Sequence, residues 1–447
     1  MKPPFFTAKP DSFAKAGLDT QFDGRQFSRL LREYLRFTRS LTLVLDCCTR
    51  CGNCSQACHS FLGTSDPDNS PVARINLFSE ARRLNPKPWS LFCKSASDTE
   101  IKDLLERWLS SFYQCNLCRR CALACPLGLD PSEVVLAGRN LLTEMGLAPR
   151  FLMEIAENLH ALGNNVGITP EALKDISVFL EQELEEETGF FIPIPIDRAG
   201  ASILYIPSST EFFSNVETLM GAAKLFHFLG VDWTLSSEIL EAANYGLFLH
   251  RELMVSHSRR LEQTATSLGC PMVLQGECGH GWRAAKMIRE GGGKSSFKLM
   301  HILEFWDENL HRFPLVRRPW RATLNDSCNY ARSCNLVEAP RRLLRACVEE
   351  FVEMTPNRQS NYCCGGGGGL LMEEMLDLRM RLGKQKADQI RAVTPLDYLC
   401  SPCASCKTQM PLLLKNHGLG DIRVGGITEL LAQCLVYTGK NPCSPAG

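Results

Sequence analysis

The sequence has no net charge and no long apolar segment. Lys plus Arg and Asp plus Glu both number 49 among 447 residues. This balance provides no basic excess for nucleic acid and no acidic excess for a solvating tail. The longest apolar stretches, such as 41–45 and 190–196, are far shorter than the ~18–20 residues that cross a bilayer. The N-terminal residues lack the apolar region and the cleavage site of a secretory signal, so we expect a cytosolic protein.

Cysteine is abundant instead. Twenty-two residues are cysteine, which is below the ~8–10% of a disulfide-stabilised scaffold. In a reducing compartment, cysteines are more often metal ligands or catalytic groups than disulfide partners. Their spacing therefore indicates which of these roles the cysteines have.

Helical patterns dominate the first part of the chain. Residues 1–45 form a predicted N-terminal helical extension, whose amphipathic helix at 27–39 we expect to pack on its own domain rather than on a membrane. Residues 46–190 form a predicted α-helical domain, with helices at 101–112 and 134–145. The proline-punctuated stretch 191–196 and Gly200 mark its end.

Beyond residue 200, short apolar strands alternate with helices. Strands are expected at 203–206, 272–274, 322–324 and 398–399, and helices at 211–228, 340–352 and 370–390. This alternation predicts an α/β domain with mainly parallel strands.

A weak internal repeat divides this second part into units 200–315 and 318–447. At a constant offset, Ser209, Asn244, Tyr245 and Gly246 correspond to Cys328, Cys363, Cys364 and Gly365. We interpret the two units as copies of one α/β unit, of which only the second keeps its cysteines.

Two cysteine runs have one spacing. They are Cys48-x2-Cys51-x2-Cys54-x3-Cys58 and Cys115-x2-Cys118-x2-Cys121-x3-Cys125-Pro126. This is the spacing of bacterial ferredoxins, in which three thiolates wrap one [4Fe–4S] cubane and the fourth reaches the other. Zinc or free thiols are the alternative, but zinc usually takes two cysteine pairs.

The ferredoxin logic assigns the ligands in two groups. We name Cys48, Cys51, Cys54 and Cys125 the first thiol group, and Cys115, Cys118, Cys121 and Cys58 the second thiol group. The first run ends in Cys58-His59 rather than Cys-Pro, and His59 is expected to be a hydrogen-bond donor or a surface residue. With helices between the runs, this domain resembles the α-helical ferredoxin domains of respiratory complexes.

A third pattern occupies the C-terminal unit. We name Cys328, Cys363, Cys364, Cys400 and Cys403 the third thiol group; Gly365–Gly369 follows its adjacent pair. The spacing resembles the cysteine-rich CCG domain of heterodisulfide reductases. The resemblance implies that these five cysteines hold a catalytic, non-cubane [4Fe–4S] cluster that cleaves or forms a disulfide. A glycine run also permits the sharp turn that two adjacent ligands need.

The whole architecture resembles the D subunit of membrane-bound heterodisulfide reductase. The sequence segments 63–68, 241–246 and 277–280 are most similar to the corresponding iron–sulfur subunits of sulfate-reducer membrane complexes. These are the sulfite-reduction-associated complex, the high-molecular-weight cytochrome complex and the tetrahaem cytochrome complex. The fold implied is α+β and multidomain: an α-helical ferredoxin-like domain with two [4Fe–4S] sites, then a pseudo-duplicated α/β CCG domain.

The resemblance also implies a function and partners. Electrons would pass from a membrane cytochrome b-type subunit through two cubane clusters to the non-cubane site. The substrate would be a disulfide or trisulfide, as on the small sulfur-carrier protein DsrC. The chain would be cytoplasmic and peripheral on the inner membrane through its partner subunits. Two alternatives are the iron–sulfur subunit of a glycolate or lactate oxidase and a non-catalytic electron relay.

Other residues receive simpler interpretations. Cys278-Gly279-His280 is expected to be vestigial or, alternatively, to face the third thiol group. Eight arginines between Arg312 and Arg345 are expected to form a solvated face or, alternatively, to dock an acidic partner or offset the charge of a cluster. Cys406, at helical spacing from Cys403, and Cys334, which follows Cys328, are expected to be spare buried thiols or, alternatively, to lie beside the cluster ligands. The remaining cysteines are expected to be structural or surface thiols: Cys47, Cys93, Cys270, Cys347, Cys434 and Cys443.

Overall fold

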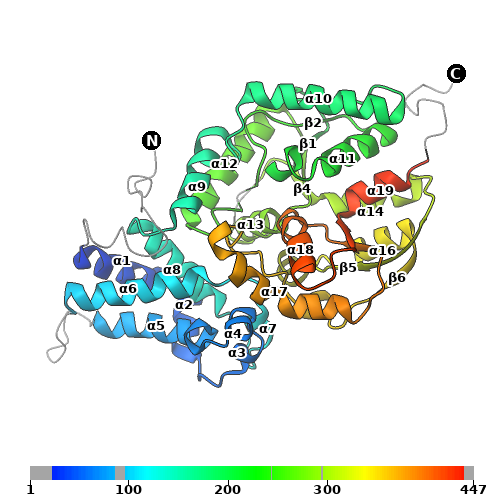
Figure 1. Cartoon of the computed structure of the whole chain (residues 1–447). Helices are drawn as coiled ribbons and strands as arrows, with labels where there is room; N and C mark the ends of the chain where they lie inside the picture. Colours follow the sequence, from blue (N-terminus) through cyan, green and yellow to red (C-terminus); the bar gives the residue numbers. More distant parts are fainter. Residues whose placement is uncertain (1–22, 86–95, 243, 293–294, 437–447) are drawn as a thin grey trace. The chain divides into compact units, whose positions relative to one another are not determined.

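The computed structural model describes residues 23–85, 96–242, 244–292 and 295–436. The chain folds into two compact units (Figure 1). The first comprises 1–157, 245–253 and 365–385, and the second comprises 158–244, 254–364 and 386–447. Among the described residues, no helix combines the length and the apolar character that crossing a membrane requires. The domain boundaries expected from the sequence stay predictions.

The first unit is helical. Its core surrounds Trp108, which stacks on Phe78 at 4.7 Å and contacts Phe27 and Phe112 edge-on or tilted. The N-terminal amphipathic helix thus packs its apolar face on its own domain, as predicted. The helices are α1 (Gly24–Phe37), α2 (Arg39–Cys47), α3 (Asn53–Gln56), α4 (His59–Thr64), α5 (Pro71–Leu84), α6 (Asp98–Tyr113), α7 (Arg120–Leu123) and α8 (Ser132–Glu144).

The second unit contains two four-stranded sheets, and all their strand pairs are parallel. The first sheet has the order β2-β1-β3-β4, and the second has β6-β5-β7-β8. The two sheets therefore have the same order of strands along the chain. The strands are β1 (Ile203–Ile206), β2 (Trp233–Thr234), β3 (Met272–Gln275), β4 (Lys298–His301), β5 (Arg318–Leu324), β6 (Val348–Val352), β7 (Tyr398–Cys400) and β8 (Arg423–Gly425).

Most of the remaining helices connect these strands; the first of them precedes β1 and the last follows β8. They are α10 (Pro170–Thr188), α11 (Val216–Leu229), α13 (Gly279–Glu290), α14 (Ile302–Asn309), α15 (Cys328–Cys334), α16 (Glu338–Cys347), α18 (Ala404–Asn416) and α19 (Ile427–Cys434). Three more helices contribute residues to both units: α9 (Arg150–Leu162), α12 (Arg251–Leu268) and α17 (Leu376–Arg391).

Three predicted helices needed correction. The helix expected at 340–352 ends at Cys347, and its last residues form the edge strand β6, whose Glu349 and Glu350 face solvent. The helix expected at 211–228 is split into a short 3-10 turn and α11. The helix expected at 370–390 begins at Leu376, because the residues before it form turns.

Candidate functional site

The two ferredoxin-type loops have the same unusual backbone. In the first run Arg50 and Gly52 have φ values of 58° and 85°, and at the matching positions of the second run Leu117 and Arg119 have 52° and 60°. A left-handed conformation costs an L-residue roughly 1–2 kcal/mol. Three non-glycine residues adopt this conformation here. The two loops therefore follow the same backbone course between their cysteines.

Thiols of the first group lie close enough to influence one another. Burial raises the pKa of Cys54 to about 11, and the neighbouring thiols of Cys48 and Cys51 raise it as well. Cys51 is exposed at the surface. The turn that ends in Cys125 follows α7, which packs against α3 of the first run.

The second thiol group combines residues from both runs. Burial raises the pKa of Cys58, and Cys115 and Cys118 raise it further. Burial also raises the pKa of Cys121, with contributions from Asp130 and from Cys58, Cys118 and Cys115. The fourth cysteine of the first run therefore lies beside the first three of the second run. This exchange is the arrangement found in two-cluster ferredoxins.

These thiol groups suit iron–sulfur clusters chemically. Buried thiols that raise one another's pKa ionise only when a strong cationic centre compensates them, as the iron of a cluster does. Within the described residues, no three His, Cys, Asp or Glu side chains converge as ligands of a single metal ion. His59, the first residue of α4, is buried rather than a surface residue.

The third thiol group lies at the carboxyl edge of the second sheet. Leu324 at the end of β5 pairs with Cys400 at the end of β7. Cys328 begins α15 shortly after β5, and Cys403 is the N-cap of α18. In parallel sheets, loops at this edge commonly form binding sites. All five cysteines of the group are buried.

A sixth thiol joins this group. The sulfur atoms of Cys406 and Cys364 are 3.3 Å apart. A hydrogen bond from Cys406 lowers the pKa of Cys403 to about 7 against the effect of burial. Sequence reasoning treated Cys406 as a spare thiol, although its helical spacing from Cys403 was the available signal. Cys334 ends α15 and is half-buried.

The Cys278-Gly279-His280 turn faces the third thiol group. A Cβ on Gly279 would lie 3.3 Å from the Cys403 sulfur. His280 Nδ1 lies 3.3 Å from the Ser405 hydroxyl, and burial lowers the pKa of His280 to about 3, which keeps the imidazole neutral. Of the two interpretations offered by the sequence, the structure therefore favours a position at the thiols.

In the loops of the first sheet, Ser209 and Asn244 both bind one buried carboxylate, that of Glu241. The Ser209 amide donates to Glu241 Oε2 at 2.9 Å, and Asn244 Nδ2 donates to Glu241 Oε1 at 3.0 Å. Burial raises the pKa of Glu241 to about 7. Hydrogen bonds within the protein thus engage both oxygens of this buried carboxylate.

A buried cluster of ion pairs connects a loop of the first sheet to loops of the second sheet, and the sequence did not predict it. Lys407 Nζ lies 3.3 Å from Glu277 and 3.4 Å from Glu429, and all three side chains are largely buried. The carbonyl of Glu277 also accepts the amide of Ala404 at 2.7 Å. This contact ties the start of α18, beside Cys403, to the loop after β3.

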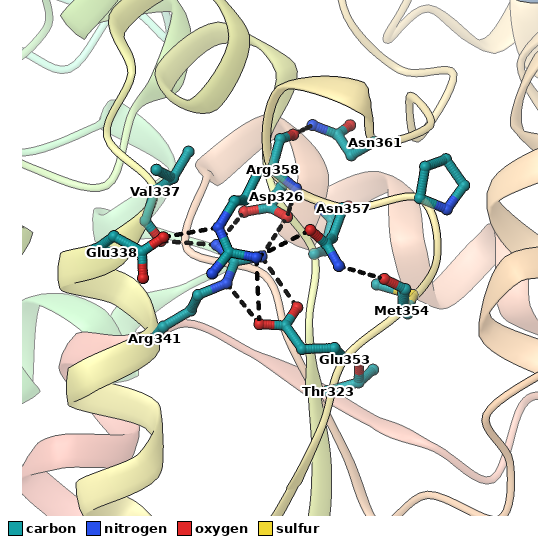
Figure 2. A network of polar contacts seen from close by, with 12 residues as sticks. Thr323, Asp326, Val337, Glu338, Arg341, Glu353, Met354, Asn357, Arg358 and Asn361 are labelled. Atoms are coloured by element: carbon teal, nitrogen blue, oxygen red, sulfur yellow. Dashed lines mark hydrogen bonds and ion pairs between the residues drawn. The ribbon is translucent and has the colours of Figure 1, made fainter.

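The arginines between 312 and 345 mostly bind groups of their own unit. Arg341 is fully buried and forms two 2.8 Å hydrogen bonds to Asp326, while its Nε contacts Glu353 at 2.7 Å (Figure 2). Arg321 pairs with Glu350, and Arg342 pairs with Asp307. Arg312, Arg317, Arg342 and Arg345 are exposed, so part of this set does lie in solvent, whereas Arg341 is buried. Docking of an acidic partner by these arginines stays a prediction.

The other cysteines divide by exposure. Cys47 is exposed, whereas Cys270 is buried. Cys347 and Cys434 are buried, and the Cys434 thiol lies 3.3 Å from the Cys347 carbonyl oxygen. Cys93 and Cys443 lie outside the described residues.

Two family models match the chain. A 4Fe-4S dicluster domain matches residues 44–129, and a cysteine-rich domain matches residues 322–411. The first match spans both ferredoxin-type runs, and the second spans the whole third thiol group. An iron–sulfur protein with a CCG domain is thereby supported.

Relatives match over nearly the whole chain. The Hdr-like menaquinol oxidoreductase iron-sulfur subunit 2 of Archaeoglobus fulgidus is 32% identical over 93% of this chain and 84% of its own length. The corresponding subunit of Archaeoglobus profundus is 30% identical over 92% and 83%. The D subunit of the dihydromethanophenazine:CoB–CoM heterodisulfide reductase of Methanosarcina acetivorans is 24% identical over 89% and 97%. The chain belongs to the family of heterodisulfide reductase-like iron–sulfur subunits, oxidoreductases that include these proteins.

Proposed function

We propose that this chain is the subunit of a membrane-associated redox complex that carries electrons to a disulfide or trisulfide. The first and second thiol groups would each hold a cubane [4Fe–4S] cluster. The third thiol group would hold a non-cubane [4Fe–4S] cluster at the catalytic site. The clusters would carry single electrons and offer two of them in turn to a bound sulfur.

One observation carries the proposal most directly. The third thiol group gathers at the carboxyl edge of the second sheet, with Cys403 at the N-terminus of α18. A helix N-terminus favours anionic groups such as thiolates and sulfide. Reduction of a disulfide takes two electrons and two protons and yields two thiols, so a site of this kind needs an electron supply, which the first two thiol groups would provide.

The two sheets support the proposed duplication. They share a strand order, and Ser209 and Asn244, at the positions that match Cys328 and Cys363, both bind Glu241. With cysteines in one copy alone, the domain would hold one catalytic cluster.

The names of the relatives suggest a quinol-type electron donor, and the partners are proposed from the family resemblance of the sequence. We propose that electrons derive from a quinol and arrive through a cytochrome b-type membrane subunit, on whose cytoplasmic side the chain would dock. A small sulfur-carrier protein of the DsrC type is the proposed substrate.

A cysteine variant tests the catalytic assignment. Cys364→Ser is expected to abolish disulfide reduction while the iron of both cubanes remains. Cys270→Ser, at a buried cysteine outside the three thiol groups, is the matched control and should retain full activity. If Cys364→Ser keeps full disulfide reduction, the third thiol group is not the catalytic site.

A further inference from the structure

Two arginines of the first unit are buried without a carboxylate partner. Arg74 on α5 is 1% exposed and Arg139 on α8 is 0% exposed. Within the described parts of the chain, neither forms an ion pair with Asp or Glu, in contrast to the equally buried Arg341, which Asp326 neutralises. Burying a charge without a counter-ion is costly, so a compensating anion is expected nearby.

The hydrogen bonds of both guanidinium groups go to neutral oxygens. Arg74 Nε donates to the Ser111 carbonyl at 2.9 Å, and its Nη2 donates to Asn69 Oδ1. Arg139 donates to the carbonyls of Phe112, Cys115 and Gly368, the last two at 2.7 Å. These contacts fix the orientation of the two side chains but do not neutralise their charges.

Both arginines lie near members of the second thiol group, and Arg139 Nη2 donates to the Cys115 carbonyl at 2.7 Å. Arg74 acts electrostatically on the Cys58 thiol, and Arg139 acts on Cys115. Asp130, the carboxylate that influences Cys121, is itself paired with Arg119 at 2.6 Å. No carboxylate of the described residues neutralises these two buried positive charges. They are therefore able to compensate the negative charge of a group bound by the second thiol group.

The first thiol group has a different environment. The nearby Arg50 is exposed, and its guanidinium donates to the side chains of Asn76 and Ser79. Cys51 of this group is exposed as well. Water screens charge at such a surface, whereas a buried guanidinium acts at nearly full strength.

We infer that Arg74 and Arg139 are positioning residues whose fixed charges raise the reduction potential of the cluster at the second thiol group above that of the cluster at the first. This inference rests on the proposed function, because it requires both cubanes. Net charge, hydrogen bonding and exposure set the potential of such clusters, and a nearby positive charge favours the reduced, more negative form. Electrons would then move downhill from the first cubane to the second.

Arg139 also links the second thiol group to the glycine run. Its Nη1 holds the Gly368 carbonyl, and a Cβ on Gly368 would lie 2.7 Å from the Cys115 carbonyl oxygen. The chain that follows Cys363 and Cys364 thus packs directly on the Cys115 loop.

Redox titration of the iron-loaded full-length chain, followed by EPR, tests the inference. Arg74→Met and Arg139→Met should each shift the midpoint of one cubane to more negative potential and leave the other unchanged. Arg74→Lys and Arg139→Lys, which keep the charge, should restore most of the shift. Arg82→Met is the matched control, since Arg82 lies on the same helix as Arg74 but is exposed and paired with Asp46.

The outcomes separate the inference from the proposed function. Two cubanes with unchanged midpoints in both methionine variants would overturn the inference and leave the proposed function intact. A wild-type chain without cubanes would overturn both. Because Arg139→Met removes several buried hydrogen bonds, Arg74→Met and the lysine variants decide the question if that protein does not fold.

Discussion

The buried ion pair of Arg341 and Asp326 supports the loop that carries Cys328, and Asp326→Asn tests its strength. The two side chains are 0% and 1% exposed and joined by two hydrogen bonds of 2.8 Å. Asp326 also accepts the amide of Arg358 at 2.6 Å. Breaking a buried pair costs about 3–5 kcal/mol. Because Glu353 still contacts Arg341 and asparagine keeps one acceptor oxygen, we expect the lower end, about 3 kcal/mol.

Amide hydrogen exchange at β5 and β6 measures this cost locally. A loss of about 3 kcal/mol corresponds to roughly 100-fold faster exchange through opening, at 1.4 kcal/mol per factor of ten. Asp388→Asn breaks the exposed pair with Arg391 and should change protection by less than about 1 kcal/mol. The double variant Asp326→Asn/Arg341→Met should recover much of the loss. Equal, small effects of Asp326→Asn and Asp388→Asn would refute the reasoning.

Three further changes have defined outcomes. Gly368→Ala places a Cβ 2.7 Å from the Cys115 carbonyl at a φ of +70°, so the iron content should fall. Gly418→Ala is the control: it has the same φ but open space around it, and it should retain full iron. Burial raises the pKa of Glu211 to about 8, so its protonated form stabilises the fold at low pH and this contribution is lost as pH rises toward 8. Thermal denaturation from pH 5 to 8 should show this decline, and Glu211→Gln should flatten it; an unchanged slope would contradict the assignment. Lys407→Met leaves Glu277 and Glu429 buried without their cation and should lower stability by about 3–5 kcal/mol at pH 7, whereas the exposed Lys415→Met should have little effect in urea denaturation.

The sequence predicted those elements that carry a strong local pattern. The strand at 203–206 matches β1, and the helices at 101–112 and 134–145 match α6 and α8 within a few residues. The strands β2, β4 and β8 were not predicted, because their residues do not form an apolar run: β4 begins with Lys298 and ends with His301, and β8 begins with Arg423. The strand β6 was predicted as helix since its Val348–Val352 segment continues a helical pattern.

The candidate site was predictable where ligands lie close in sequence. The cysteine spacing predicted which thiols group together, and Cys58 does lie close enough to Cys115 and Cys118 to be influenced by them. That these thiols are cluster ligands stays a prediction. The burial of Arg139 and Arg341 was not predictable from the sequence. Arg139, for example, donates to the carbonyl of Gly368, which lies 229 positions further along the chain. Arg341 likewise depends on Glu353, whose position follows from the unpredicted strand β6. Such long-range partners depend on tertiary packing, which local pattern does not encode.

Anaerobic iron and acid-labile sulfide analysis, combined with EPR of the oxidised protein with and without a thiol substrate, tests the central claim most directly. The account predicts about 12 iron atoms per chain, from three four-iron clusters. It also predicts a paramagnetic signal that appears only when the thiol is present. About 8 iron atoms, with no thiol-dependent signal, would contradict a catalytic cluster at the third thiol group and leave a relay with two cubanes.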